Sequence, residues 1–276
     1  MEVQIFMRIG NENFDLNHNV YIMGILNVTP DSFSDGGNWN RLDNALKHTE
    51  QMIADGADII DVGGESTRPG YTLLEEEVEI NRVVPVIEAI KARFDIPVSI
   101  DTYKSAVAEA AVKAGADMLN DIWGFQYDEK MADVAARYKL PCCLMHNRKQ
   151  AIYENYLQDV CSDLQRSIDI AHKAGVEDKQ IILDPGIGFG KTYENNLQLL
   201  NHLEVIKNMG YPVLLGTSRK SVIGLTLNLP VTEREEGTIA TTVLGIQKGC
   251  SMIRVHNVWG NKRAAVMTKA ILDAIV

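Results

Sequence analysis

MGILNVTPDSFSDGG, residues 23–37, sets the pattern on which the rest of the chain is built. An apolar strand over residues 20–26 breaks abruptly into Asn, Thr, Pro, Asp, Ser and Gly, which favour turns and surface loops. The loop carries two carboxylates, three hydroxyls and an aromatic ring, although an ordinary strand-to-helix connection is the alternative. We therefore expect a buried strand that ends in a functional loop.

Apolar strands alternate with amphipathic helices along the rest of the chain. We expect eight strands, at residues 20–28, 59–63, 98–101, 118–122, 142–146, 181–184, 213–216 and 252–256. Helices are expected near residues 40–55, 75–93, 103–114, 129–138, 154–174, 193–209, 233–248 and 260–274. This pattern predicts an α/β fold that closes as a single (β/α)8 TIM barrel over residues 1–276. A doubly wound open sheet is the alternative, because periodicity does not show closure.

Two local signals complete the fold prediction. Residues 3–9 and 13–16 alternate between apolar and polar side chains, which predicts a short N-terminal β-hairpin outside the barrel. Gly56, Gly115 and Gly249 stand where the chain must turn back toward a strand, so we expect each to end a helix. No linker or low-complexity tract divides the sequence, which favours one domain.

The composition argues against several classes of function. The chain has 37 acidic and 27 Lys or Arg residues, a formal net charge of −10 and a pI near 5.1, so neither nucleic acid nor a membrane surface is expected as a partner. Its four cysteines show no C-x-x-C spacing, and buried reduced thiols are favoured over a metal site or a redox pair. The sequence has no signal-peptide pattern and no apolar run of membrane-spanning length, which predicts a cytoplasmic protein.

Polar side chains gather at the carboxyl ends of the expected strands, where the active sites of such barrels are built. For a single Asp, Asn, Ser or Thr there, capping of the next helix is the favoured explanation. Capping does not explain the cations, because a positive charge opposes the dipole at a helix N-terminus. The cations predict a site for an anion such as phosphate or pyrophosphate, and they are Arg219, Lys220, Arg254 and His256.

Carboxylates and an amide stand on other strands of the same rim. Asp101, Asn120 and Asp184 are expected to point into one pocket, where buried carboxylates need hydrogen-bond donors. A ligand with N–H groups in a fixed fork, such as an amino-pyrimidinone, would supply them, whereas an internal ion pair with Lys220 is the alternative. The glycines of residues 184–191 would let the backbone approach a flat ligand, and residues 63–70 would form a lid or an ordinary turn.

These motifs occur together and in order in one known family. The chain resembles the dihydropteroate synthases, folate-pathway enzymes that sulfonamides target, from the first strand to the eighth. The matching motifs are GILNVTPDSFSDGG at 24–37, DVGGESTRPG at 61–70, SIDT at 99–102, ND at 120–121, MH at 145–146, DPGIGFGK at 184–191, SRK at 218–220 and RVH at 254–256. The resemblance implies condensation of 6-hydroxymethyl-7,8-dihydropterin pyrophosphate with 4-aminobenzoate, giving 7,8-dihydropteroate and pyrophosphate.

The resemblance also implies roles for the motif residues. The pterin would be bound by Asp101, Asn120, Ile122, Met145, Asp184, Phe189, Lys220 and Arg254. Pyrophosphate would be bound by Asn27, Thr67, Arg68, Arg254 and His256, and 4-aminobenzoate by Phe33, Pro69, Phe189, Lys220 and Ser221. The implied catalytic residues are Asp101, Lys220, Asp35 and Arg254. Asn27 would lie near a Mg²⁺ cofactor, and the enzyme would be a homodimer.

The residue types suit a dissociative displacement. No Ser-His-Asp set is evident, and an aniline nitrogen is already neutral near pH 7, so no strong base is required. Departure of pyrophosphate is the difficult step, and cations and Mg²⁺ stabilise it. We therefore expect the C–O bond to break first, with Asp101 stabilising the pterin methylene cation. The alternatives are a pterin-dependent methyltransferase, a non-catalytic pterin-binding homologue and an aldolase-type barrel, which would need a lysine in place of Asp184.

Overall fold

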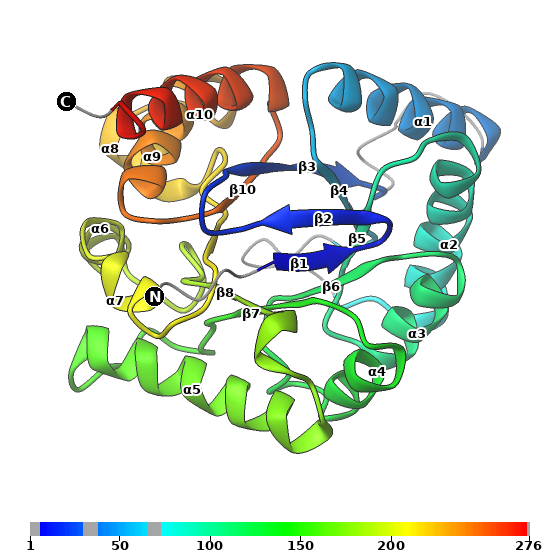
Figure 1. The fold of residues 1–276 in the computed structure, drawn as a ribbon, viewed down its shortest axis with the longest axis horizontal. Helices are drawn as coiled ribbons and strands as arrows, with labels where there is room; N and C mark the ends of the chain where they lie inside the picture. The colour runs from blue at the N-terminus through cyan, green and yellow to red at the C-terminus, as the bar shows by residue number, and fades with distance from the viewer. Residues whose placement is uncertain (1–5, 30–37, 66–72, 275–276) are drawn as a thin grey trace.

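The computed structural model describes residues 6–29, 38–65 and 73–274, with the backbone alone for residues 38–41. Within these ranges, eight strands form the central sheet and helices surround it (Figure 1). The strands are β3 (Tyr21–Asn27), β4 (Ile59–Gly63), β5 (Val98–Asp101), β6 (Met118–Asp121), β7 (Cys142–Met145), β8 (Ile181–Asp184), β9 (Leu214–Leu215) and β10 (Met252–Val255). Each strand lies inside the range expected for it. A strand of a parallel sheet is buried on both faces, so its position is marked by a continuous apolar run.

The sheet closes into a barrel. Hydrogen bonds join the strands in the order β8-β7-β6-β5-β4-β3-β10-β9, and every neighbouring pair is parallel. A parallel bridge between Leu183 and Val213 connects β8 to the residue before β9, and the Leu183 N–H donates to the Pro212 carbonyl at 2.9 Å. The expected (β/α)8 barrel is therefore confirmed, and the open sheet is excluded.

Helices cover the outside of the barrel (Figure 1). They are α1 (Asn38–Ala54), α2 (Glu76–Arg93), α3 (Ser105–Lys113), α4 (Lys130–Tyr138), α5 (Tyr156–Ala174), α6 (Tyr193–Asn201), α7 (Glu204–Lys207), α8 (Ser221–Leu227), α9 (Glu235–Gln247) and α10 (Val258–Leu272). The prediction of one continuous helix near residues 193–209 was wrong. His202 leaves the helical conformation at φ −125°, and Leu203 turns into the core. The short helix α8 lies outside the helix ranges predicted from periodicity, and it begins at Ser221. The three helix-ending glycines are confirmed, with φ of +98°, +111° and +90° at Gly56, Gly115 and Gly249.

An antiparallel hairpin closes the amino-terminal end of the barrel. It consists of β1 (Phe6–Ile9) and β2 (Glu12–Asp15), with Ile9 paired to Glu12, and it lies across the strands in the view of Figure 1. Its buried side chains pack against inward-facing residues at the starts of the barrel strands, in a cluster of Met7, Ile9, Phe14, Leu16, Met23, Ile59, Met118, Cys143, Ile182, Leu214 and Met252. The hairpin is confirmed, and it leaves the carboxyl ends of the strands as the open end.

The cysteines and the helix compositions agree with an ordinary barrel interior. All four cysteines are free, and Cys142, Cys143 and Cys250 are buried as expected, whereas Cys161 is only partly buried. Burial raises the pKa of the Cys142 thiol above its ordinary value, so it stays protonated. Across the described ranges, none of the helices combines the length and the apolar character that a bilayer crossing requires.

Candidate active site

The strand register brings the expected polar residues to one level of the rim. Asn27 and Asp101 both pair with Gly63, from the two sides of β4, and Asp101 pairs in turn with Asn120. Between β7 and β8, Met145 pairs with Asp184. Because parallel strands end at the same edge, residues separated by more than 150 positions in sequence face one space.

Arg254 of β10 lies at the centre of a charged cluster. Its Nε donates to Asp61 Oδ2 and its Nη2 to Asp101 Oδ2, both at 2.6 Å. Asn120 Nδ2 also donates to Asp61 Oδ2, at 3.1 Å. The Oδ1 atoms of Asp61 and Asp101 are buried and accept no hydrogen bond from the described residues. Two unused acceptors in a charged pocket are what a ligand with N–H donors needs.

Asp61 is a site residue that sequence analysis did not assign to the pocket. It is fully buried in the middle of β4, within the run IIDVG. A carboxylate in the centre of a fully buried strand was the available signal, because burial of a charge requires a partner.

Asp184 and Lys220 form the opposite side of the pocket. Asp184 Oδ1 accepts the Gly186 N–H at 2.7 Å. Lys220 Nζ donates to the Ile187 carbonyl and lies 4.7 Å from the centroid of the Phe189 ring. The hydrogen bond of Lys220 therefore goes to a backbone carbonyl rather than to a carboxylate, so the alternative of an internal ion pair is not what the geometry shows.

The shared burial of these charges shifts their pKa values toward the neutral forms. Burial raises the pKa of Asp101 to about 7, against the opposing attraction of Arg254. Burial likewise raises the pKa of Asp184, opposed chiefly by Lys220. It lowers the pKa of Lys220 to about 8, opposed chiefly by Asp184. Such opposed shifts in one cleft are characteristic of functional groups.

Apolar side chains form one wall of the pocket. Ile122 and Met145 are buried in a small cluster with Tyr103, and Trp123 and Phe189 pack against it. The three apolar residues expected at the pterin, Ile122, Met145 and Phe189, are therefore brought together. The Phe189 ring also connects this wall to the ammonium of Lys220.

The remaining cationic residues lie where β9 and β10 end. Ser218 Oγ accepts the His256 backbone N–H at 3.1 Å and lies 2.9 Å from His256 Nδ1. Arg219 has a positive φ of 57°, and its backbone N–H donates to Thr238 Oγ1 at 3.1 Å. Ser221 is exposed as the first residue of α8, directly after Lys220. The turn thus presents Lys220 and Ser221 side by side at the rim.

Several expected residues lie outside the described part of the chain, namely Asp35, Phe33, Thr67, Arg68 and Pro69. The described residues on both sides of segment 66–72 are joined by Lys104. Its Nζ donates to Glu65 Oε2 at 2.5 Å, to Glu79 Oε2 at 2.6 Å and to the Leu74 carbonyl at 2.8 Å. Lys104 was not assigned a role from the sequence, because its partners come from three separate elements.

Comparison with known proteins first defines the class. The family described as "Pterin binding enzyme" matches residues 23–256, so the chain belongs to the pterin-binding barrel enzymes. Within that class it belongs to the dihydropteroate synthases. The synthase of Clostridium beijerinckii is 64% identical over 267 residues, covering 96% of this chain and 99% of that protein. The synthase of Bacillus subtilis is 58% identical over 252 residues, covering 91% and 88%.

Solved structures give the same assignment. The dihydropteroate synthase of Clostridium difficile, determined in the presence of pteroic acid, superposes with a TM-score of 0.93 at 51% identity, covering 95% of this chain and 100% of that one. The Xanthomonas albilineans enzyme, determined with 4-aminobenzoic acid, gives 0.94 at 38% identity, covering 99% and 100%. The chain is therefore a transferase with dihydropteroate synthase activity. The methyltransferase, binding-homologue and aldolase alternatives have no support from these relatives.

Proposed function

We propose that the pocket between Arg254 and Lys220 condenses 6-hydroxymethyl-7,8-dihydropterin pyrophosphate with 4-aminobenzoate to give 7,8-dihydropteroate. One observation carries the proposal: Asp61 and Asp101 each keep a buried oxygen without a donor among the described residues, beside an arginine that both of them hold. A flat ligand rich in N–H groups would satisfy the Asp101 acceptor at the end of β5, and its leaving group would meet the cations of the same rim.

The pterin binds between the charged and apolar sides of the pocket. Asp184 accepts the 2-amino and N3–H groups of the ring, while Asn120 and Asp101 bind the remaining edge. Lys220 donates to the ring oxygen and N5, and the Arg254 guanidinium covers one face of the ring. The support is that these residues line one space, with Ile122, Met145 and Phe189 as its apolar wall.

The reaction proceeds by loss of pyrophosphate before attack of the amine. The bond between the pterin methylene carbon and the bridging oxygen breaks, and its electron pair leaves with pyrophosphate. The cation that remains is stabilised by the pterin ring and by the Asp101 carboxylate, which lies in the pocket and has one unused oxygen. The aminobenzoate nitrogen then uses its lone pair to form the C–N bond and releases one proton to solvent.

The leaving pyrophosphate is bound by cations and polar groups at the ends of β3, β10 and the segment after β4. Arg254 and His256 are brought to the rim by β10, and Asn27 ends β3. Thr67 and Arg68 complete this site in the proposal, and Asp35 acts as a catalytic carboxylate that assists the metal. Positive charge at this position stabilises the developing negative charge of the leaving group.

Asn27 fits a magnesium site that is completed by the substrate. Asn27 ends β3 at the rim, and a methyl group built on Gly63 of the neighbouring strand would lie 3.6 Å from Asn27 Oδ1, so this oxygen donor stands at the carboxyl end of the barrel. Mg²⁺ prefers oxygen ligands and is commonly held by one or two protein groups together with substrate phosphates. Bound there with Asn27, Mg²⁺ would neutralise charge on the departing pyrophosphate.

The 4-aminobenzoate lies over Phe189 and Lys220, with its carboxylate at Ser221. Phe33 and Pro69 close this pocket in the proposal. The support is that Ser221 begins α8 beside Lys220, so its hydroxyl stands next to a cation.

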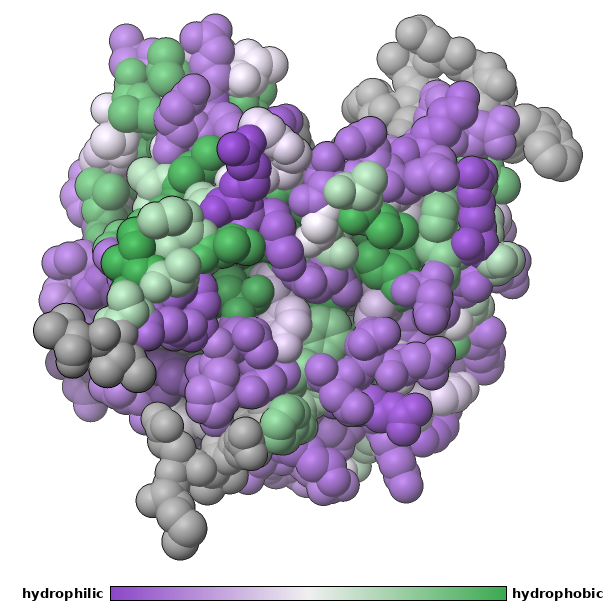
Figure 2. Space-filling model, turned by 45° about the horizontal axis from the view of Figure 1, so that its top comes forward, coloured by the Kyte–Doolittle hydropathy of each residue, from purple (hydrophilic) through white to green (hydrophobic). Residues whose placement is uncertain are grey.

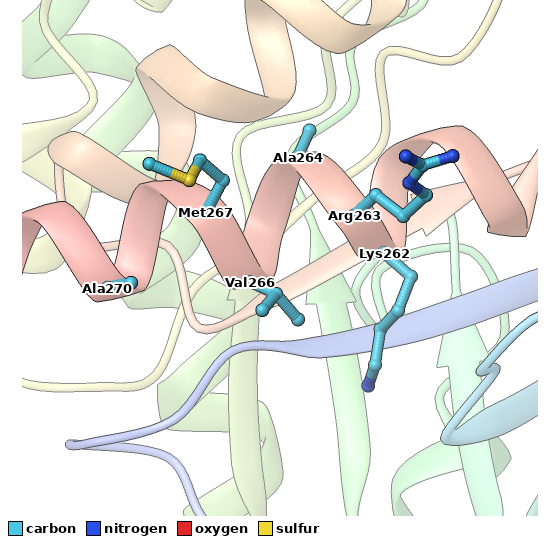
Figure 3. Close-up of a pocket in the computed structure, with 6 residues that line it drawn as sticks. All are labelled: Lys262, Arg263, Ala264, Val266, Met267 and Ala270. Atoms are coloured by element: carbon cyan, nitrogen blue, oxygen red, sulfur yellow. The ribbon is translucent and has the colours of Figure 1, made fainter.

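Two copies of the chain assemble through α10. Figure 2 shows apolar surface on the side of the molecule where α8 to α10 lie in Figure 1. Figure 3 shows Val266, Met267 and Ala270 along the outer face of α10, in a hollow that Lys262 and Arg263 border. Exposed apolar residues continue along the same helix, namely Trp259, Val266, Met267, Ile271 and Leu272. Exposed apolar side chains along one helix can be buried against the same helix of a second copy across a twofold axis, which supports the homodimer.

Sedimentation tests the homodimer. The wild-type chain should sediment as a dimer and Met267→Asp as a monomer, whereas Val78→Asp, which changes an exposed valine on α2, should remain dimeric. A monomeric wild type would refute the homodimer. We further propose that residues 1–276 act as one domain and that the protein works in the cytoplasm.

Pyrophosphate release tests the proposed function. The purified protein is supplied with the dihydropterin pyrophosphate and Mg²⁺, with and without 4-aminobenzoate. Release that depends on the amine, with dihydropteroate formed in equal amount, is the expected result. Pterin binding without release would overturn the proposal in favour of a binding protein.

A further inference from the structure

A second polar network lies behind the pocket, on the outer side of the loop that follows β8. Lys191 Nζ lies 2.7 Å from His146 Nδ1 and donates to the carbonyls of Gly186 at 2.9 Å and Phe189 at 3.0 Å. His146 Nε2 lies 3.1 Å from Asp163 Oδ2 on α5. Asp163 Oδ2 also accepts Arg148 Nε at 2.5 Å. None of these side chains has a role in the proposed chemistry.

The loop joined by this network is packed tightly against the end of β7. Gly186 has a positive φ of 68°, and a Cβ at that position would lie 1.9 Å from the His146 carbonyl oxygen. A Cβ on Gly190 would lie 2.3 Å from the Arg148 carbonyl oxygen. The loop therefore approaches the neighbouring backbone as closely as glycine permits. Its outer carbonyls meet Lys191, which holds the loop in that position.

The inner side of the same loop contacts residues of the proposed pterin site. Ile187 accepts the hydrogen bond of Lys220, and the Phe189 ring lies below the Lys220 ammonium. Phe189 also packs against Ile122 and Met145 in the apolar wall. A shift of the loop would therefore move both the carbonyl that binds Lys220 and the apolar wall of the pterin pocket.

We propose that Lys191 is a positioning residue of the reaction. It fixes residues 186–189 through their outer carbonyls, and this keeps Lys220 and Phe189 in the positions from which they contact the pterin. The proposal rests on the proposed function of the pocket. Its physical basis is that Lys191 joins two carbonyls of one loop to His146, directly after β7, which Asp163 in turn orients from α5. Such a support fixes a residue in contact with substrate without touching substrate itself.

Titration of Lys220 provides a readout of its position. Burial lowers the pKa of Lys220 to about 8, and the charged groups that face it are Asp184, Arg254 and Asp101. Burial lowers the pKa of Lys191 well below its ordinary value, and the charged groups that face it are Asp184, Lys220, Asp163 and Arg148, besides the His146 ring. A relaxed loop would admit water to Lys220, and its pKa would then move toward the ordinary value of 10.5.

The test compares Lys191→Met, which keeps the length of the side chain and removes its donors, with Lys149→Met, which changes an exposed lysine nearby. Lys191→Met should raise the KM for the pterin substrate by on the order of tenfold with a smaller change in kcat. The alkaline limb of its kcat/KM profile should move to higher pH. Lys191→Arg, which keeps the donors, should recover part of the wild-type KM, and Lys149→Met should match the wild type throughout.

A stability effect alone would not satisfy the proposal. If Lys191→Met lowers the urea midpoint but keeps the wild-type KM and pH profile, Lys191 is only structural and the inference is overturned. A wild type that forms no dihydropteroate would instead refute the proposed function, and affinity for a pterin measured by calorimetry then tests Lys191 separately. An unchanged pterin affinity in Lys191→Met would overturn the positioning role in that case too.

Discussion

Asp101 is the residue whose two oxygens have different tasks. Oδ2 holds Arg254 at 2.6 Å, while Oδ1 is buried without a donor among the described residues. A carboxylate with this arrangement can orient the guanidinium and still face positive charge that develops on a ligand. Asp61 also orients the guanidinium, because it accepts a hydrogen bond from Arg254 Nε. The same carboxylate accepts a hydrogen bond from Asn120 Nδ2.

Replacement of Asp101 by Asn removes the negative charge of the side chain and keeps its shape. Asp101→Asn should lower kcat by about 100-fold, because a neutral amide does not stabilise the methylene cation as a carboxylate does. Steady-state rates of pyrophosphate release measure this. Asp58→Asn is the control, since Asp58 pairs with Lys262 before the start of β4, away from the rim. Full turnover in Asp101→Asn would contradict the role given to Asp101.

The two shifted pKa values predict a narrow pH optimum. The pKa of Asp101 is raised to about 7, so the carboxyl becomes neutral as the pH falls through that value. The pKa of Lys220 is lowered to about 8, so the ammonium loses its charge as the pH rises through that value. In the proposed mechanism both charges act on the pterin, so kcat/KM should be greatest between these limits, when measured from about pH 5 to about pH 10.

The same profile in Asp101→Asn assigns the acid limb. Whatever activity is left should no longer decline below about pH 7 through this group, while the alkaline limb should persist. An acid limb that is unchanged in the variant would show that another group controls it.

At the level of elements, the loop after β8 combines a strand end with three glycines of positive φ, at Gly186, Gly188 and Gly190. Gly188 is also held through its N–H, which donates to Asn196 Oδ1 of α6 at 2.6 Å. The loop is therefore fixed from β7, from α6 and from Lys220. Its shape depends on contacts with three elements rather than on its own sequence.

Substitution of Gly186 tests how tightly this loop is packed. Gly186→Ala should lower the free energy of unfolding by about 2–4 kcal/mol, because the new methyl group would meet the His146 carbonyl at 1.9 Å in a strained backbone conformation. Urea unfolding followed by circular dichroism measures the loss.

Gly210→Ala is the matched control. Gly210 also has a positive φ, of 92°, but nothing lies within 4 Å of a Cβ built there. It should show the cost of backbone strain alone, about 1 kcal/mol. Equal losses in the two variants would mean that the approach to His146 contributes nothing.

For the whole molecule, the barrel separates stability from chemistry along its axis. The hairpin β1–β2 closes the amino-terminal end with a cluster of apolar side chains, and the charged pocket occupies the carboxyl end. In barrels of this kind the first end contributes to stability and the second to function.

Phe14 tests this separation. Phe14→Ala should lower the free energy of unfolding by about 3–5 kcal/mol, because the side chain is buried against the starts of the strands. Phe6→Ala, on the exposed side of the hairpin, should change it by no more than about 0.5 kcal/mol. The KM for the pterin substrate should be the same in both folded variants, and a raised KM in Phe14→Ala would show that the two ends are coupled.

The sequence predicted the strands and most helices, because an apolar run that is buried on both faces has only one stable role in a parallel sheet. It also predicted that Asp101, Asn120, Asp184, Lys220 and Arg254 would share one rim, since strand ends carry the site in a closed barrel. The break between α6 and α7 could not be predicted, because it depends on where Leu203 finds space in the core.

Closure and pairing were decided by tertiary structure alone. Periodicity gives strands but not the bridge from Leu183 to Val213 that completes the ring. The partners of Arg254 come from β4 and β5, 193 and 153 positions away in sequence, and no local pattern encodes such a distance. The role of Asp61 and the support by Lys191 became visible only once the strands had brought their partners within hydrogen-bonding distance. Residue types and their order were thus set by the sequence, and which charges meet was set by the geometry of the closed barrel.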